Sequence, residues 1–231
     1  MTETTANKPP PAATEAKASA PQARPPEAGG SAAPRLRRSL PVLEQLAALY
    51  PHLFGEVFLP MKRGIFQDLL TAHPELFERE ALKAALALHA RSSRYLIAVA
   101  AGQQRHDLQG QAVEAMAPEH VHHALLEVYR RRQTRSKEDL RPKLIARIVQ
   151  ACEASGLAPH AYAERVRSRD EAANVVLDEA MLELEARAAK AQALLQAFKA
   201  SGKTVDEFAD MYGMDPRSVN RMLARAPATP A

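Results

Sequence analysis

The chain has 231 residues, of which 46% are hydrophobic and 25% are charged, a composition typical of a folded protein with one domain and appendages. No stretch approaches the roughly 18 consecutive apolar residues that a membrane-spanning helix requires. The single cysteine excludes an internal disulfide and a cysteine-based zinc site. The first 39 residues contain no hydrophobic run of the secretory type, so we expect a cytoplasmic protein.

The amino-terminal segment has the composition of a disordered tail. Residues 1–38 hold seven of the seventeen prolines and a single leucine. Such a segment buries too little apolar surface to offset the entropy lost on ordering. We therefore expect a disordered tail over residues 1–38, ending in a small basic cluster.

From Ser39 onward, apolar residues recur at helical spacing, and Ser39 and Pro41 are start signals for a first helix. Ser92 and Ser93 are N-cap candidates for a later one, and Ser136 to Asp139 has the spacing of a capping box. The glycine-flanked stretch 102–110 is long enough for a small hairpin. The sequence thus predicts a mainly α domain over residues 39–152, with helices at about 39–53, 60–70, 79–90, 93–99, 118–129 and 140–152.

Residues 153–231 form a separate helical extension in this interpretation. Apolar residues alternate at spacings of four and three from Leu177 to Phe198, which predicts a heptad helix at about 170–200. This helix packs either on its own chain or on a second copy. Thr204 and Glu207 have capping-box spacing, and residues 204–225 are similar to a helix-turn-helix segment. This segment either binds DNA, adds a contact to RNA, or only packs on the rest of the chain.

Basic residues are concentrated in one part of the middle segment. Residues 129–147 contain eight lysines and arginines and only two acidic residues. A local excess of this size attracts polyanions even when the whole chain, at +4, is nearly balanced. The alternative is a solvated helix face.

No catalytic motif is present, so we expect no enzyme activity and no cofactor. The sequence has no glycine-rich phosphate loop and no nucleophile elbow. His120, His122 and His123 are close in sequence, but on a helix His122 points away from His120. We therefore expect no metal site there, and we expect Cys152, on an apolar helix face, to be a buried structural thiol.

Three motifs occur in a characteristic order. The stretch Leu59–Leu69 contains Pro-Met-Lys-Arg-Gly-Ile, Arg94-Tyr-Leu follows, and Gly102-x-x-Arg-x-Asp-Leu-x-Gly comes third. These motifs resemble the FinO domain of the ProQ/FinO family of RNA-binding proteins and RNA chaperones, over about residues 39–132. The resemblance departs at His89, where many members have tyrosine, and it does not extend to residues 153–231.

The resemblance implies recognition of structured RNA, namely a stem followed by a short 3′ single-stranded tail. Small RNAs and messenger 3′ ends are then the expected partners, and the protein is an RNA chaperone that acts after transcription. Duplex RNA offers mainly its phosphates and its shape, which basic side chains bind without reading sequence. The candidate RNA-binding residues from the resemblance and the basic run are Lys62, Arg63, His89, Arg91, Ser92, Ser93, Arg94, Tyr95, Arg105, Arg130, Arg131, Arg132 and Arg135.

Two of these roles have alternatives. Tyr95 either stacks on a base or is a core residue, and Arg94 either contacts RNA or forms a surface ion pair. For the whole chain, the alternatives are a DNA-binding regulator that uses the segment 204–225 and a coiled-coil adaptor that uses the heptad helix.

Overall fold

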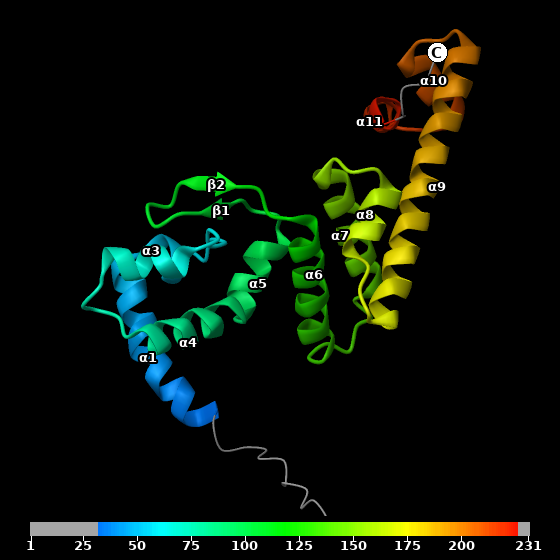
Figure 1. The fold of residues 1–231 in the computed structure, drawn as a ribbon. Coiled ribbons are helices and arrows are strands. Elements are labelled where there is room, and N and C mark those ends of the chain that lie inside the picture. Colours follow the sequence, from blue (N-terminus) through cyan, green and yellow to red (C-terminus); the bar gives the residue numbers. More distant parts are fainter. Residues whose placement is uncertain (1–31, 226–231) are drawn as a thin grey trace, which may run out of the picture.

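The computed structural model describes the backbone of residues 32–225 and the side chains of residues 39–224. This part of the chain is mainly α, as predicted, with one small antiparallel hairpin (Figure 1). None of its helices is long and apolar enough to cross a membrane. The elements are α1 (Ala32–Leu49), α2 (Pro51–Phe54), α3 (Ile65–Ala72), α4 (Arg79–Ala90), α5 (Ser93–Ala100), β1 (Arg105–His106), β2 (Ala112–Glu114), α6 (Pro118–Gln133), α7 (Arg141–Ser155), α8 (Pro159–Val166), α9 (Glu171–Ser201), α10 (Val205–Tyr212) and α11 (Pro216–Arg225).

The first helix begins earlier than the sequence predicts. Most of the expected tail, residues 1–31, lies outside the described residues, but residues 32–38 belong to α1. Pro41 lies inside this helix instead of near its start. A proline there removes one backbone hydrogen bond. The face of α1 that buries Leu46 packs along α4, and we attribute the continuity of the helix to this contact.

The loop before α3 is fastened to the hairpin. The backbone N–H of His106 donates to the carbonyl of Pro60 at 2.7 Å, and the N–H of Lys62 donates to the carbonyl of His106 at 2.8 Å. Gly64, at φ 82°, then takes the left-handed conformation directly before α3. The predicted helix over residues 60–70 therefore begins only at Ile65, and Met61 to Arg63 form an anchored loop.

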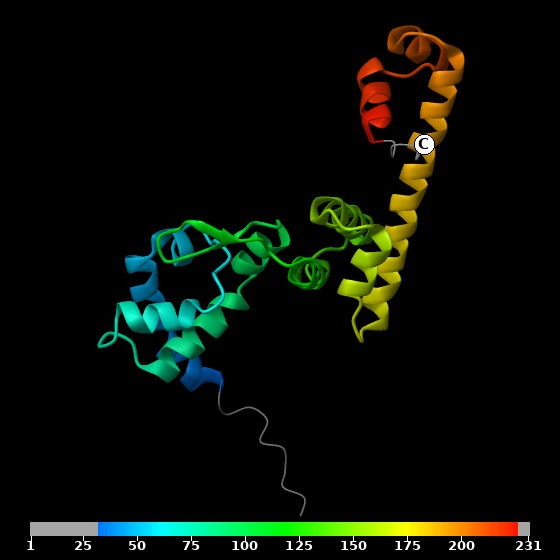
Figure 2. The ribbon, with the colours of Figure 1, turned by 45° about the horizontal axis from the view of Figure 1, so that its top comes forward.

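One hydrophobic core extends through most of the described chain. It runs from Leu46 in α1 to Met181 in α9. Figure 2 shows α6 between the group formed by α1 to α5 with the hairpin and the group formed by α7 to α9. Because α6 packs against α5 on one side and against α7 and α8 on the other, it joins the two groups into one packed body.

The segment that precedes α7 differs from the predicted capping box. Ser136 Oγ accepts a hydrogen bond from the N–H of Glu138, and Asp139 Oδ1 accepts one from the N–H of Arg141. These short-range bonds close a turn, and α7 begins at Arg141 after Leu140. The short helix α8 is absent from the sequence prediction, and its fully buried Tyr162 belongs to the main core.

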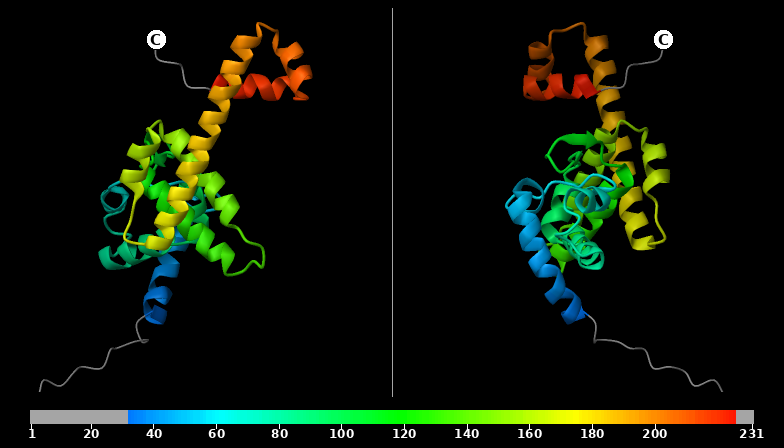
Figure 3. Two further views of the ribbon diagram at one scale, coloured as in Figure 1. Left: turned by 90° about the vertical axis from the view of Figure 1, so that its right-hand side faces the viewer. Right: turned by 60° about the vertical axis from the view of Figure 1, so that its left-hand side comes forward.

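The long helix α9 confirms the predicted heptad helix and packs at both of its ends within the chain. Leu177 and Met181 belong to the main core, whereas Leu194 and Phe198 pack with α10 and α11. Figure 3 shows this second group at the far end of α9, away from the main body. The predicted boundary at residues 152/153 stays a prediction, although the main core continues across it.

Candidate nucleic-acid interface

The start of α5 is built as the sequence predicts. Ser92 is the N-cap, and its Oγ accepts a hydrogen bond from the N–H of Tyr95 at 3.2 Å. The first helical residues, Ser93 and Arg94, are exposed. Their N–H groups make no hydrogen bond within the described part of the chain, as is usual at a helix start. This end of α5 therefore presents backbone donors toward solvent.

Tyr95 is a core residue, the second of its two predicted alternatives. Only 8% of it is exposed, and burial raises the pKa of its hydroxyl group. The hydroxyl oxygen accepts a hydrogen bond from the N–H of Met61 at 3.2 Å. Tyr95 thereby ties α5 to the loop that carries Lys62 and Arg63, which sets the position of that loop.

His89, one of the predicted RNA-binding residues, also lies in the core. Its ring packs among the rings of Phe54, Phe58 and Tyr95, at centroid distances of 4.7, 4.5 and 5.3 Å. Only 4% of the residue is exposed, and burial lowers its pKa to about 4. No ring face remains for a nucleotide in this arrangement.

The basic residues in and beside the loop of residues 61–63, called the Lys62 loop from here on, differ in solvent exposure and in their partners. Lys62 Nζ binds Asp68 Oδ2 at 2.8 Å, a hydrogen bond that raises the pKa of the lysine. Arg63 pairs with Glu114 and keeps 67% of its side chain exposed. Arg105 is only 12% exposed and donates to the carbonyl of Met61 at 2.9 Å. Arg105 therefore braces the loop, and Arg63 is the most accessible cation there.

Arg131 joins the start of α5 to the end of α6. Its Nη1 donates to the carbonyl oxygen of Arg91 at 2.8 Å and to Ser93 Oγ at 3.1 Å. Arg131 is also 3.8 Å from Glu127, one turn earlier in α6. This arrangement brings together residues 91–94 and the basic run, which are about forty positions apart in sequence.

A first pocket, of about 390 Å³, lies beside this junction. Arg132 and Arg135 line it, and their guanidinium groups make no ion pair or hydrogen bond among the described residues. Ile97 and Val128 contribute apolar surface to the same pocket. The complete lining is Ser93, Ile97, Val128, Arg131, Arg132, Arg135, Ser136 and Leu140.

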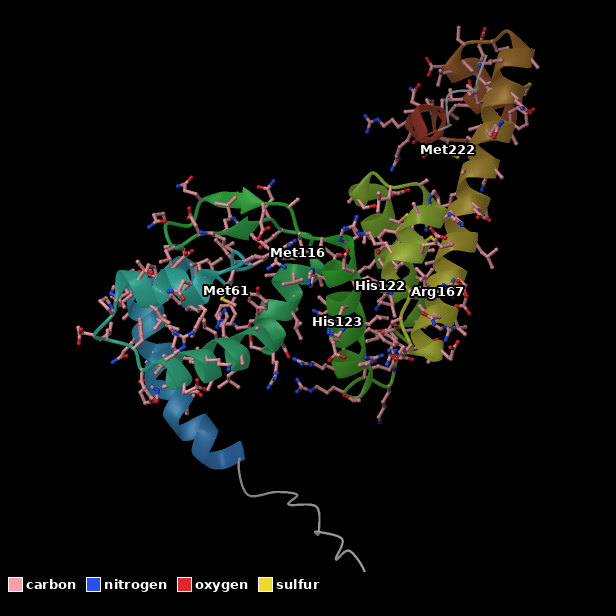
Figure 4. All side chains as sticks on the ribbon, in the orientation of Figure 1. Met61, Met116, His122, His123, Arg167 and Met222 are labelled. Atoms are coloured by element: carbon pink, nitrogen blue, oxygen red, sulfur yellow. The ribbon has the colours of Figure 1, made fainter. Side chains whose placement is uncertain are left out.

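A second pocket, of about 300 Å³, opens between α5 and α6 and shares Arg131 with the first. His120 and His123 line it, together with Arg91 and the inner residues Tyr95 and Arg105. Both histidines are exposed and lie on the face of α6 that also carries Glu127 and Arg131. His122 points the other way and is buried. Figure 4 labels His122 and His123 on α6.

In the part of the chain that the structure describes, no group of three or more histidine, cysteine, aspartate or glutamate side chains could hold a metal ion. The pairing of His120 and His123 in one pocket follows from their spacing of three, although the sequence alone does not identify the residues opposite them. Both are functional candidates that the predicted contact set omits.

The other members of the basic run point elsewhere. Arg130 forms ion pairs with Glu127 and Asp170. Arg141 binds Glu179 through two hydrogen bonds of 2.9 and 2.7 Å, and Lys143 binds Glu138. Of the four predicted arginines in the run, the structure thus brings Arg131, Arg132 and Arg135 to the junction and turns Arg130 away.

Arg94 stands at the outer edge of the α5 start. Its guanidinium lies over the ring of Phe58, with Cζ 5.3 Å from the ring centroid. It makes no ion pair among the described residues, which removes the surface ion pair that was its alternative. Arg91, Ser93, Arg94 and Arg131 therefore form one positively charged rim around the amino-terminal end of α5.

This part of the chain is similar to known proteins. Residues 36–141 match the model of the ProQ/FINO family. The match covers somewhat less than half of the chain. Similarity also extends to the crystal structure of a FinO-like RNA chaperone from Neisseria meningitidis MC58, with 28% sequence identity over 44% of this chain and 82% of that one and a TM-score of 0.38. Both pockets are lined by residues of the matched segment, whereas α8 to α11 lie outside it.

Proposed function

We propose that residues 36–141 are a ProQ/FINO domain that binds structured RNA at the junction of α5 and α6 and acts as an RNA chaperone. The observation that carries this proposal is the pair of pockets that share Arg131. Arg132 and Arg135 make no ion pair there, so their charge is available to phosphate groups. The name of the similar neisserial protein, a FinO-like RNA chaperone, supports the same class of ligand.

The geometry favours an RNA stem with a single-stranded 3′ end. An RNA duplex exposes its phosphates while its major groove is too narrow for side chains, so cations at the rim bind it by charge and shape. A single-stranded end can enter a pocket that a duplex cannot. The unpaired N–H groups of Ser93 and Arg94 then bind the terminal phosphate or hydroxyl group.

Small RNAs and messenger 3′ ends have this form, so we propose them as the targets and the cytoplasm as the compartment. On this model the protein protects RNA ends and promotes pairing between RNA strands. The proposed contacts are Arg63, Arg91, Ser93, Arg94, Arg131, Arg132 and Arg135, with His120 and His123 in the second pocket.

The test compares two adjacent arginines. Arg131→Gln removes the guanidinium that both pockets share, and we expect it to weaken binding of a hairpin with a 3′ tail by roughly ten- to hundredfold, since a charge-assisted hydrogen bond contributes about 1.5–3 kcal/mol. Arg130→Gln is the matched control. It removes the same charge from the same helix, but its partners are Glu127 and Asp170, so we expect a small effect.

The titrations use hairpins with a free 3′ tail, with a 3′-phosphorylated tail and with no tail. We expect the wild-type protein to prefer the free tail and the Arg131 variant to lose most of that preference. Equal losses for the two arginine variants would place the RNA elsewhere on the surface. Equal wild-type affinity for all three RNAs would show that the domain binds duplex shape alone.

A further inference from the structure

The end of α9 and the two last helices form a three-helix unit with a core of its own. Phe208, Ala209 and Val219 are fully buried in it, and Leu194 and Phe198 of α9 pack against them. The rings of Phe198 and Phe208 meet edge to face at a centroid distance of 5.4 Å. Since α9 supplies one wall, α10 and α11 have a fixed orientation on it (Figure 3).

The turn between α10 and α11 is equally well defined. Gly213 ends α10 in the left-handed conformation, at φ 62°, and the N–H of Met214 donates to the carbonyl of Ala209 at 2.8 Å. Asp215 Oδ2 then accepts a hydrogen bond from the N–H of Ser218 at 3.0 Å, which caps the first turn of α11. Two helices joined by such a turn and supported by a third are the arrangement of helix-turn-helix domains.

The two faces of α11 differ sharply in character. Val219 and Leu223 face the small core, and Met222 lines a pocket against α9. The opposite face carries Arg217, Asn220 and Arg221, which are all exposed. Figure 4 shows nitrogen-tipped side chains that project from α11 away from α9.

None of these three polar side chains has a hydrogen-bond or ion-pair partner among the described residues. Elsewhere on the exposed surface, Arg165, Arg167 and Arg187 each pair with a carboxylate. The nearby acidic residues Glu207 and Asp215 are engaged by helix starts, in a capping box with Thr204 and in the cap of Ser218. In the described part of the chain, neither these carboxylates nor the exposed Asp206 and Asp210 of α10 form an ion pair with Arg217 or Arg221.

We propose that this face of α11 is a second nucleic-acid site, which takes the backbone phosphates of a duplex. Arginine guanidinium groups bind phosphate oxygens through paired hydrogen bonds, and Arg217 and Arg221 lie one turn apart on a rigid helix. Asn220 lies between them with an amide that donates and accepts. The site goes beyond the proposed function because it lies outside the ProQ/FINO domain, about 20 Å along α9 from the main core, counted from Met181 to Leu194.

The test uses the full chain and the double variant Arg217→Gln/Arg221→Gln. Both side chains are exposed and outside the small core, so the thermal midpoint should not change. Affinity is titrated at several salt concentrations against an RNA duplex and a DNA duplex, both without tails. We expect affinity to fall by about tenfold or more, and the salt dependence for DNA to become shallower by about 1.8 for two lost phosphate contacts.

The control is Arg165→Gln/Arg167→Gln, which removes two charges from arginines that are already paired. If Arg217→Gln/Arg221→Gln lowers the affinity for only one of the two duplexes, the result supports the site and identifies which nucleic acid supplies the phosphates. Equal affinities and salt slopes for the two double variants, on both duplexes, would overturn the proposal. The preference for a free 3′ tail reports on the α5–α6 junction alone, so failure of one site is distinguishable from failure of the other.

Discussion

Two buried histidines make the folded protein sensitive to acid. His89 and His122 are 4% and 3% exposed, and each has a buried ring nitrogen without a partner among the described residues. Burial lowers the pKa of both to about 4, and the charge of His123 adds to the effect at His122. A cationic imidazole in either position would be buried without compensation, so protonation favours the unfolded chain.

The first prediction concerns the resulting dependence of stability on pH. Since the folded-state pKa values lie below the unfolded value of about 6.5, the stability from the neutral rings is complete above pH 6.5 and falls as the pH drops toward 4. The loss is on the order of 2 kcal/mol for each histidine near pH 4.5. Thermal melts of wild type and His89→Phe between pH 7 and pH 4.5 measure it, and the variant should show a flatter profile.

His160 provides the control for this prediction, because its side chain is 85% exposed and Glu164 is its one ion-pair partner among the described residues. His160→Gln should leave the pH profile of the wild type unchanged. A profile for His89→Phe as steep as that of the wild type would show that the acid sensitivity originates at other groups.

The residues of the proposed RNA site were only partly predictable from the sequence. The excess of arginine in the run 129–147 is visible in the sequence, but the partners of Arg130 and Arg141 are Asp170 and Glu179, some forty residues away. Ion pairs of this kind depend on how α9 packs, which local patterns do not contain. Arg131 was predicted from charge, whereas its role as the link to Ser93 depends on the packing of α5 against α6.

At the scale of single elements, the hairpin shows how a loop holds the site in place. β1 pairs with Met61 of the Lys62 loop as well as with β2. Glu114 of β2 contacts both Arg63 and Arg105. Gly110 lies in the turn at φ 76°, and a Cβ atom there would be 2.8 Å from the ring of His52. His52 in turn donates to the carbonyl of Leu108 at 3.1 Å.

The second prediction follows from this close approach. Gly110→Ala has two costs. The alanine must adopt a left-handed backbone conformation, which destabilises the fold by about 1–2 kcal/mol, and its Cβ atom must displace the His52 ring. We expect a lower thermal midpoint and weaker RNA binding, since the Lys62 loop rests on the hairpin. Gly102→Ala is the matched control, because Gly102 has φ 71° and open space around the added atom. If the two variants were equally stable, the contact with His52 would be without energetic effect.

Elements whose signals are local were predicted well. Ser92 caps α5 and Thr204 forms a capping box with Glu207, both as expected from sequence. The start of α1 was misplaced and the capping box predicted at residues 136–139 is absent, because Pro41 and residues 136–139 each have two local solutions. Tertiary packing and short-range side-chain bonds choose between those solutions, and neither is encoded in periodicity.

At the scale of the whole molecule, the main core does not stop where the family resemblance stops. Leu144, Ile148, Val149 and Cys152 form the buried face of α7. Besides α6, their cover comes from beyond residue 152, where Tyr162 of α8 and Val176, Leu177 and Ala180 of α9 belong to the same core. After Met181, residues 182–190 are exposed or only half-buried, and a separate small core begins at the far end of α9.

The third prediction is that the independently folding unit ends near residue 185 instead of at residue 152. A fragment of residues 32–152 lacks Tyr162, Val166 and Leu177 and leaves uncovered the side of α7 that packs on α8 and α9. Each fully buried side chain of this size stabilises the fold by about 1.5–3 kcal/mol, so the sum is comparable to the total stability of a small domain. We expect this fragment to melt without cooperativity and to expose apolar surface, whereas a fragment of residues 32–185 melts cooperatively.

A fragment of residues 32–201 is the control for the length of α9. It should melt at nearly the same temperature as residues 32–185, since no residue of 186–201 belongs to the main core. Cooperative unfolding of residues 32–152 at that same temperature would show that α8 and α9 are dispensable, and that the sequence-predicted boundary is the correct one.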